Sequence, residues 1–410
     1  MTNKSDISRR EFLKDTAVGA AGVAAWSGLG SSRVVGANDR IRVAVLGSGG
    51  RAQDVMSKFR MFPDNEIVAV CDVYEPHRTS ALKAAGAGAK AYLDYHEVLD
   101  RKDIDAVLIG SPDHWHKQML VDSVRAGKDA YLEKPIIHAI EEGAEMVRAV
   151  HETNRVVQTG TQQRSWDHYI RGKQIVDSGK LGKIIYVHTY WYQNYLAWTS
   201  EPPRIDTSKL DWKRWLGSAP DQPFDAQKFA LWRHYWDFGG GILTDLLTHW
   251  IDVIQWYMNQ PVPKTATTTG QTYLFKWEAP DAVTTALEFP GNFMVAFTGA
   301  YNHSIDDGGI EFRGSQATLK IDRAHLAVYE EGKEWEPASM APKPEIFMRA
   351  ERDGTVDHVK NFLECVRSRE TPNAPIQVGF EAARTGWLAN IALKRGTKIT
   401  WDAAKNKVVS

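Results

Sequence analysis

Residues 41–52, IRVAVLGSGGRA, join a short β-branched run to a glycine-rich turn. The run at 41–46 is typical of a buried strand in a parallel sheet. The turn fits the pattern G-x-G-x-x-A, in which the first glycine permits a tight bend and the second lets the backbone approach a pyrophosphate. The third position must be small so that strand and following helix pack closely, and Ala52 meets that need. The stretch therefore predicts the first βα unit of a dinucleotide-binding domain.

An acidic residue ends the next predicted strand. Residues 66–72, EIVAVCD, form a second apolar run that stops at Asp72, near the spacing at which a carboxylate takes the ribose hydroxyls of a dinucleotide. A carboxylate there repels a ribose phosphate, so the sequence favours NAD over NADP, although the nearby Arg78 leaves NADP open. The alternative interpretation of Asp72 is a cap for a helix over the following residues, EPHRTSAL.

Two further predicted strands end in short polar motifs. Residues 104–110, IDAVLIG, run into SPDHWH at 111–116, and residues 129–136, DAYLEKPI, contain the sequence Glu-Lys-Pro. In open α/β sheets the ligand lies off the carboxyl ends of the strands, where both motifs fall. No Cys or acidic partner stands at ligand spacing from His114 and His116, so we expect no metal site. We expect His116 to open a helix beside the cofactor.

These motifs, taken in order, resemble those of one enzyme family. The GxGxxA turn, Asp72, SPDHWH and the EKP of residues 133–135 are similar to the Gfo/Idh/MocA oxidoreductases, named for glucose-fructose oxidoreductase, inositol dehydrogenase and a rhizopine-catabolism protein. The resemblance implies that Lys134 lies beside the nicotinamide and the reacting carbinol, that the bond before Pro135 is cis, and that Gln162 lies near the nicotinamide carboxamide. The candidate cofactor-binding residues are Gly47, Ser48, Gly49, Gly50, Arg51, Asp72, Ser111, Pro112, Asp113, His116, Glu133, Lys134 and Gln162.

The second half of the chain is typical of an α+β domain. Residues 156–165, VVQTGTQQRS, are expected to begin it with a strand and a polar turn, and later runs such as AVTTALEFP and FMVAFTGA alternate clearly. We expect an α/β protein with a Rossmann domain at 38–158. A second domain at 159–410 would carry a large, mainly antiparallel open sheet, with C-terminal helices that could pack back on the first domain.

The stretch 232–257, WRHYWDFGGGILTDLLTHWIDVIQWY, holds the remaining catalytic candidates. Asp245 and His249 are four residues apart in a predicted apolar helix, so they are expected to share one face. Alone, the pair is better explained as a surface ion pair or a satisfied core histidine. Its apolar surroundings and its match to the family's D-x-x-x-H pattern favour His249 and Lys134 as catalytic residues, with Asp245 in support. Asp252 could be an additional partner.

Aromatic residues cluster around the same region. Fifteen tryptophans are many for 410 residues, and most are expected in the core. Some could form a sugar-stacking wall, whereas packing in the core or in a dimer interface is at least as good an explanation for any one of them. The candidates for the wall are Trp191, Tyr192, Tyr195, Trp198, Trp232 and Trp236.

The N-terminus reads as an export signal. Residues 8–14, SRREFLK, precede a short, weakly apolar stretch and a small-residue site, which predict a twin-arginine signal at 1–37 with Ala37 as its last residue and a periplasmic or extracytoplasmic protein. A net charge of -1, from 50 basic and 51 acidic residues, favours neither nucleic acid nor, for the mature form, a membrane partner. Two cysteines, Cys71 and Cys365, allow at most one disulfide.

Together these features predict an NAD(P)-dependent oxidoreductase that acts on the CH–OH group of a sugar or sugar derivative. Because free dinucleotide is not dependable outside the cytoplasm, we expect a tightly bound, internally recycled cofactor. One alternative is an NAD-dependent glycoside hydrolase that works by transient oxidation, elimination and re-reduction. A second is a sugar-binding module with a vestigial nucleotide fold. The resemblance also implies a homodimer or homotetramer.

Overall fold

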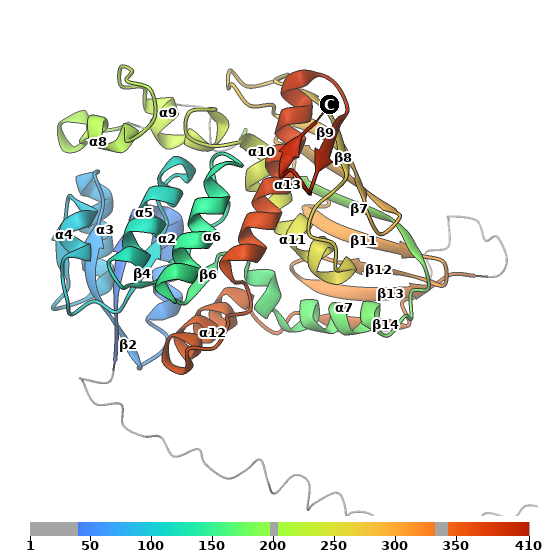
Figure 1. The fold of residues 1–410 in the computed structure, drawn as a ribbon, viewed down its shortest axis with the longest axis horizontal. Coiled ribbons are helices and arrows are strands. Elements are labelled where there is room, and N and C mark those ends of the chain that lie inside the picture. The colour runs from blue at the N-terminus through green and yellow to red at the C-terminus, as the bar shows by residue number, and fades with distance from the viewer. Residues whose placement is uncertain (1–39, 197–203, 333–342, 410) are drawn as a thin grey trace, which may run out of the picture. The chain divides into compact units, whose positions relative to one another are not determined.

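The first sheet consists of six parallel strands in the order β3-β2-β1-β4-β5-β6 (Figure 1). The computed structural model describes residues 40–196, 204–332 and 343–409, so the predicted signal at 1–37 and Trp198 lie outside the described residues. This strand order is that of a doubly wound nucleotide-binding sheet. The strands are β1 (Ile41–Leu46), β2 (Asn65–Cys71), β3 (Lys90–Tyr92), β4 (Ala106–Ile109), β5 (Asp129–Leu132) and β6 (Val157–Thr159).

Helices cover both faces of this sheet, which explains why β4 and β5 are buried along their whole length. One of the covering helices comes from the far end of the chain, because Phe362 of α12 packs against Phe59 and Tyr131. The elements are α2 (Gly50–Phe59), α3 (Glu75–Ala85), α4 (Tyr95–Leu99), η2 (Asp113–Trp115), α5 (His116–Arg125), α6 (Glu142–Thr153) and α12 (Gly354–Ser368).

The second sheet has ten strands in the order β14-β13-β12-β11-β7-β10-β9-β8-β15-β16. All its pairs are antiparallel except β7 with β10, so the predicted fold class is confirmed. The strands are β7 (Ile184–Tyr192), β8 (Thr265–Gln271), β9 (Ala282–Phe289), β10 (Phe293–Ala300), β11 (Gly308–Gly314), β12 (Ala317–Ile321), β13 (His325–Glu330), β14 (Ile346–Arg349), β15 (Ile399–Asp402) and β16 (Lys407–Val408).

Most helices of the second half lie on one face of the ten-stranded sheet or between the two sheets, whereas the short helices within residues 207–234 lie over helices of the first sheet (Figure 1). Trp250 of α11 and Tyr257 near its end are almost fully buried in this layer. The elements are η3 (Gln162–Ser165), α7 (Asp167–Asp177), η4 (Thr207–Lys209), α8 (Trp212–Leu216), α9 (Ala226–Ala230), η5 (Trp232–His234), α10 (Gly241–Asp245), α11 (Leu247–Met258) and α13 (Ile376–Arg395).

The strand expected to begin the second domain belongs to the first sheet instead. β6 pairs in parallel with β5, and the amide of Gly160 just beyond it donates to Leu132 O at 2.7 Å. Its outer edge is covered, because Gln158 bridges to Pro375 and Thr159 N donates to Ala374 O. A short apolar strand is stable in either sheet. The contacts with Ala374 and Pro375, which cover its outer edge, determine that β6 joins the first sheet.

Two sequence features have simple structural outcomes. Cys71 and Cys365 are both buried and free, so they form no disulfide with each other. Within the described ranges, no helix combines the length and the apolar character that a membrane crossing requires.

Candidate active site

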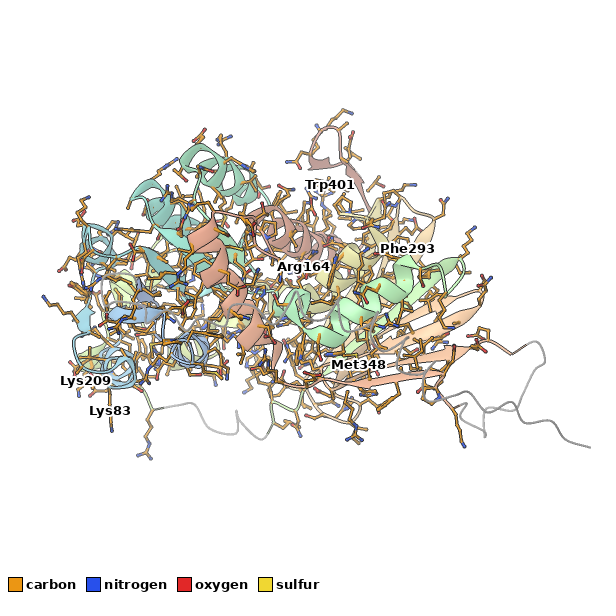
Figure 2. The ribbon with its side chains drawn as sticks, turned by 90° about the horizontal axis from the view of Figure 1, so that it is seen from below. Lys83, Arg164, Lys209, Phe293, Met348 and Trp401 are labelled. Carbon is orange, nitrogen blue, oxygen red and sulfur yellow. The ribbon has the colours of Figure 1, made fainter. Side chains whose placement is uncertain are left out.

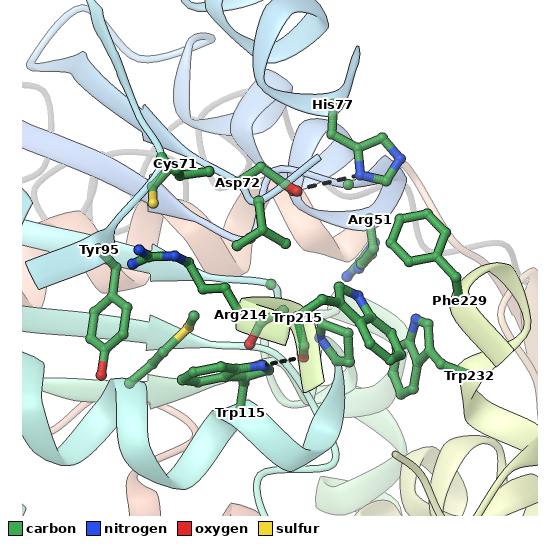
Figure 3. Close-up of a pocket in the computed structure, with 18 of the residues that line it drawn as sticks. Arg51, Cys71, Asp72, His77, Tyr95, Trp115, Arg214, Trp215, Phe229 and Trp232 are labelled. Atoms are coloured by element: carbon green, nitrogen blue, oxygen red, sulfur yellow. Dashed lines mark hydrogen bonds and ion pairs between the residues drawn. The ribbon is translucent and has the colours of Figure 1, made fainter. Parts of the chain in front are cut away.

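A cavity of about 490 Å³ lies at the carboxyl ends of β1, β2 and β4, and we call it the glycine-turn cavity (Figure 3). Its volume is in the range of small-molecule sites, roughly 300–1,000 Å³. It contains seven of the predicted cofactor residues: Gly47, Gly49, Gly50, Arg51, Asp72, Ser111 and Pro112. Ser48 is fully buried and does not line it; its amide donates to Asp72 Oδ2 at 2.8 Å.

The glycines of the turn have separate roles. Gly47 has a φ of +74°, and a Cβ there would come within 2.6 Å of the Ser111 backbone, so a side chain is excluded. A Cβ on Gly50 would meet nothing within 4 Å, because that glycine faces open space. No side chain caps the N-terminus of α2, whose first residue is Gly50. This uncapped helix end fits a pyrophosphate, as the sequence predicted.

Asp72 holds the turn together and also faces the cavity. Besides the Ser48 amide it accepts the Tyr74 amide at 2.9 Å, and its Oδ2 lies 3.5 Å from His77 Nδ1 (Figure 3). The N-cap of α3 is Tyr74 rather than Asp72, so the alternative interpretation of Asp72 as the cap of that helix is wrong. Its contact with the ribose of a dinucleotide stays a prediction. Arg78 lines neither cavity of the site, because its Nη1 donates to the Asp72 carbonyl at 2.5 Å.

Residues 205–235, which we call the cover segment, close the glycine-turn cavity from above. The segment belongs to the second half of the chain but lies over α3, α4 and α5 (Figure 1). The Nζ of its Lys209, which is labelled in Figure 2, lies 3.4 Å from Glu75 Oε1 of α3. It contributes Ile205, Arg214, Trp215, Phe229, Ala230, Trp232 and Arg233 to the lining. The cavity is therefore enclosed between the nucleotide-binding sheet and this segment.

Polar contacts anchor the cover segment to the first domain at several points. Arg214 Nη1 lies 2.5 Å from Asp94 Oδ2, and Trp115 Nε1 donates to the carbonyl of Trp215 at 2.8 Å (Figure 3). The Asp211 amide donates to Val73 O at 3.2 Å. The anchors span the β2–α3 loop, the start of α4 and the start of α5, so the segment is held along its length.

A second cavity, of about 250 Å³, adjoins the first, and we call it the lysine cavity. The two share five lining residues: Arg51, Gly110, Ser111, Trp232 and Arg233. The lysine cavity contains the three predicted catalytic residues, Lys134, Asp245 and His249. It also contains the predicted cofactor residues Asp113, His116, Glu133 and Gln162.

Lys134 and Asp245 form a buried ion pair at the centre of the lysine cavity. Lys134 Nζ lies 2.6 Å from Asp245 Oδ1 and donates to the Asp245 carbonyl at 2.8 Å. Burial raises the pKa of Asp245, but the positive charges of Lys134 and Arg233 outweigh burial and hold it at about 2. The bond before Pro135 is cis, as the resemblance implied.

The predicted single helix through Asp245 and His249 is broken at Leu246. α10 ends at Asp245, α11 begins at Leu247, and the His249 amide donates to Leu246 O rather than to Asp245 O. The carbonyl of Asp245 is thereby released to accept Lys134 Nζ. Asp245 and His249 thus face one cavity from two short helices, rather than from successive turns of one.

His249 is poised as a neutral imidazole. It is 5% exposed, its ring centroid lies 5.4 Å from that of Trp191, and its Nδ1 has no hydrogen-bond partner among the described residues. Burial, with nearby Lys134 and Arg323, lowers its pKa well below 6.5. A neutral imidazole at physiological pH can accept a proton.

The remaining predicted cofactor residues surround the lysine cavity from the first sheet. Glu133 Oε1 accepts from Arg51 Nε at 3.0 Å, and His116 lies between the carbonyls of Ser111 and Pro135 at 2.9 and 2.7 Å. Burial raises the pKa of Asp113 and lowers that of His116 to about 4. Within the described residues, no group of three His, Cys, Asp or Glu side chains is placed to hold a metal ion.

The aromatic candidates separate into two groups. Trp191, Tyr195 and Trp232 line the lysine cavity, whereas Tyr192 and Trp236 line neither cavity. The hydroxyl of Tyr192 lies 3.0 Å from that of Thr298, and Lys394 Nζ lies 3.7 Å above the Trp236 ring, so both are used in packing.

Asp252 also has a role outside the two cavities. It is fully buried and accepts two bonds from Arg164 Nε, at 2.9 and 3.0 Å. Burial raises its pKa to about 6 despite the charge of Arg164. This pair joins η3 to α11 behind the site.

Sequence reasoning missed two arginines and most of the cover segment. Arg233 stacks on Trp232 at 4.2 Å and approaches Asp245 Oδ1 at 3.4 Å, and Arg323 enters the lysine cavity from the β12–β13 turn. Arg233 stands in the WRHYW stretch, next to a tryptophan that was a candidate. No local pattern marks Arg323.

With this geometry in place, comparison with protein families becomes informative. Residues 41–161 match the model of an oxidoreductase family with an NAD-binding Rossmann fold, and residues 169–320 match the GFO/IDH/MocA C-terminal domain. The matches lie side by side along the chain and belong to one family. The chain is a member of the Gfo/Idh/MocA oxidoreductases and carries their NAD-binding Rossmann domain.

Curated relatives include two inositol dehydrogenases. Inositol 2-dehydrogenase of Salmonella typhimurium is 32% identical over 128 residues, which are 31% of this chain and 38% of the relative. The chain thus matches under two fifths of the length of that relative. The scyllo-inositol 2-dehydrogenase (NAD(+)) of Bacillus subtilis is 23% identical over 377 residues, covering 87% of this chain and 98% of the relative.

Solved structures show the same fold. A levoglucosan dehydrogenase in complex with NADH and levoglucosan matches with a TM-score of 0.69 at 16% identity, covering 88% of this chain and 99% of that one. The aldose-aldose oxidoreductase of Caulobacter crescentus matches with a TM-score of 0.69 at 17% identity over the same shares. At these identities the likeness establishes the fold alone.

Proposed function

We propose that this protein is an NAD-dependent oxidoreductase that oxidises a CH–OH group of a sugar or polyol. The observation that supports it best is the meeting of Lys134, Asp245 and neutral His249 in a cavity adjoining the glycine-turn cavity. Relatives named as inositol dehydrogenases point to the same class of substrate. Trp191, Tyr195 and Trp232 supply the aromatic surface that a sugar ring uses.

The residues present fit NAD. Gly49, Gly50 and the uncapped end of α2 would hold its pyrophosphate, and Asp72 would accept hydrogen bonds from its ribose. Gln162 Oε1 is buried without a partner among the described residues, which fits an acceptor for the nicotinamide carboxamide. The carboxylate of Asp72 would repel a ribose phosphate, so NAD is favoured over NADP. When bound, the cofactor supplies the hydride acceptor.

The chain's own groups would handle the proton. His249 is the proposed acceptor of the hydroxyl proton, because it is neutral and unpaired at Nδ1. Lys134 would hold the reacting oxygen, and Asp245 fixes the ammonium by two contacts, one from its carboxylate and one from its carbonyl. Asp245 is therefore a positioning residue in this proposal.

The cover segment supports a tightly bound, internally recycled cofactor. To leave, a dinucleotide under residues 205–235 would need the Arg214–Asp94 and Trp115–Trp215 contacts to open. We further propose export by the twin-arginine route to the periplasm, on the motif at residues 8–14. A retained cofactor would suit that compartment, since the hydride would be returned to a second carbonyl compound within the cycle.

A homodimer or homotetramer is also proposed. The face of the ten-stranded sheet away from its helices exposes large apolar side chains, among them Met294 and Phe347, which are 39% and 53% exposed. An apolar open sheet face favours contact with a second copy. Sedimentation of the purified protein tests this, and a monomer at working concentration would contradict it.

The function is tested on protein purified without added nucleotide. The protein is incubated with free sugars, inositols and aryl glycosides while reduced-nicotinamide absorbance and aglycone release are followed together. We expect a lasting rise in reduced cofactor that is limited by the amount of enzyme and discharged by a second carbonyl compound. Steady aglycone release without net reduction would contradict the proposal and support the glycoside hydrolase instead.

A further inference from the structure

Arg323 reaches the lysine cavity from the second sheet. It stands in the turn between β12 and β13, and its guanidinium carbon lies 4.5 Å from the centroid of Trp191 and 6.0 Å from that of Trp250. The centroid of the same Trp191 ring lies 5.4 Å from the centroid of the His249 ring. Arg323 and His249 therefore share one indole as a neighbour, and both line the lysine cavity.

Arg323 forms no ion pair within the described residues. The other cations of the cavity each contact a carboxylate: Arg51 with Glu133 at 3.0 Å, Lys134 with Asp245 at 2.6 Å and Arg233 with Asp245 at 3.4 Å. Arg323 pairs with no carboxylate among the described residues, and its Nε is buried without a hydrogen-bond partner. Burial lowers its pKa, and the charges of Asp307 and Asp353, neither of which forms an ion pair with it, do not offset that effect. An enclosed charge is normally paired, so the partner is expected to be a ligand.

Arg384 is a second arginine that stacks on aromatic rings, but it does so outside the two cavities. Arg384 lies over Phe380 at 4.9 Å and over Trp401 at 5.5 Å, and its Nε is also without a partner among the described residues. Arg384 lines neither cavity, and Glu381 is its nearby counter-charge. Arg323 differs from Arg384 because it lines a cavity, so a ligand can reach the guanidinium of Arg323.

We propose that Arg323 binds an acidic group on the substrate, so that the protein acts on a sugar acid or an acidic sugar ester rather than on a neutral sugar. A guanidinium presents a planar fork of donors that matches a carboxylate or a phosphate. Its position beside Trp191 places the acidic group near the carbon whose hydroxyl faces His249. This inference rests on the proposed function for the identity of the site, but it concerns the charge of the substrate.

The test compares matched neutral and acidic sugars on the cofactor-containing protein. Glucose, glucuronate and glucose 6-phosphate are titrated while tryptophan fluorescence reports binding and absorbance reports reduction. We expect at least one acidic probe to bind roughly tenfold or more tightly than glucose, a difference of about 1.4 kcal/mol. Added salt should reduce the preference. If only glucuronate binds more tightly than glucose, the acidic group of the substrate is a carboxylate. If only glucose 6-phosphate does so, the acidic group is a phosphate.

Three variants separate the possible roles of Arg323. Arg323→Met should abolish the acid preference without lowering the ratio of bound cofactor to protein, Arg323→Lys should keep part of it, and Arg384→Met should leave it unchanged. Equal affinity for neutral and acidic probes in the wild type would overturn the inference. A loss of cofactor in Arg323→Met would also overturn it, because the arginine would then serve the cofactor's own phosphates.

The two proposals fail in distinguishable ways. If no sugar reduces the cofactor but acidic probes still bind through Arg323, the proposed oxidation is wrong and the acid site stands. If neutral sugars reduce the cofactor as well as acidic ones do, and Arg323→Met changes neither, the oxidation stands and the acid site is wrong.

Discussion

The two adjoining cavities differ in how far the protein satisfies its own polar groups. In the glycine-turn cavity Asp72, Arg214 and the indole of Trp115 all have partners within the chain. Of the residues that line only the lysine cavity, four have a buried atom with no partner among the described residues: Asp113 Oδ1, Gln162 Oε1, His249 Nδ1 and Arg323 Nε. Ser111 Oγ, in the wall that the two cavities share, has none either. Buried polar atoms are normally paired. Buried atoms without a partner are thus concentrated in the lysine cavity, where a reacting molecule would supply the missing partners.

The largest expected effect is a loss of catalysis with no change in cofactor binding. His249→Asn should lower kcat for sugar oxidation by roughly 10²–10⁴-fold, because the proton acceptor is removed. The amount of bound cofactor should not change, since His249 does not line the glycine-turn cavity. His303→Asn is the control, because His303 lines neither cavity. Wild-type turnover in His249→Asn would remove this histidine from the mechanism.

Breaking the ion pair should cost stability as well as activity. Asp245→Asn leaves Lys134 and Arg233 in the cavity without a carboxylate, and removing one partner of a buried pair costs about 3–5 kcal/mol. Asp177→Asn removes a partner that is 50% exposed from its pair with Lys173, and about 1 kcal/mol or less is expected. Urea unfolding of both variants tests the contrast. Equal losses of unfolding free energy in the two variants would show that the buried Lys134–Asp245 pair contributes no more to stability than an exposed pair.

Loosening the cover segment should release the cofactor without touching the lysine cavity. Trp215 stacks on Trp212 at 4.7 Å and packs beside Phe238, so Trp215→Ala should weaken the segment. We expect cofactor dissociation to be roughly tenfold faster or more, equivalent to about 1.4 kcal/mol. Trp401→Ala is the matched control, since Trp401 is buried and lines neither cavity. Dialysis followed by cofactor assay compares the two, and equal retention would argue against a cover role.

The smallest effect is the contribution of a single buried histidine to the pH dependence of stability. Burial lowers the pKa of six histidines. It holds those of His114, His116, His234 and His358 at about 3 to about 4, and it also lowers those of His138 and His249. In the unfolded chain they take up protons below pH 6.5, so native stability is present above that value and is lost as pH falls toward the folded pKa. Each contributes about 1.4 kcal/mol per pH unit.

One histidine can be isolated from this sum. His234 stacks on Trp277 at 3.7 Å, so His234→Phe keeps a ring in place and removes the titration. Urea unfolding between pH 6.5 and about 5 should show a shallower loss for the variant, by about 1.4 kcal/mol per pH unit. Parallel wild-type and variant curves would mean that His234 is protonated in the folded protein.

The first sheet could be predicted because its signals are local. The glycine turn, Asp72 and the motifs at 111–116 and 133–135 each follow a buried strand, and parallel topology alone brings strand ends together. β6 was expected in the second domain because the sequence of a three-residue strand does not indicate which strand it pairs with. The outcome depends on contacts with Ala374 and Pro375, more than 200 residues away.

The second half of the site was less predictable for the same reason. The spacing of Asp245 and His249 indicated one helix, but the break at Leu246 depends on Lys134, which takes the Asp245 carbonyl from 111 residues away. The cover segment has short helices and weak periodicity, and its anchors are as remote as Arg214 and Asp94, 120 residues apart. Arg323 is an ordinary turn residue until Trp191 is folded beneath it.

The most direct test mixes one reactive sugar with dialysed protein in the absence of added nucleotide, and follows reduced-nicotinamide absorbance in wild type and in His249→Asn. Both proteins are first shown to contain the same amount of cofactor. The account predicts a rapid rise in the wild type that is no larger than its bound cofactor, and almost no rise in the variant. A rise that requires free NAD, or an equal rise in both proteins, would contradict it.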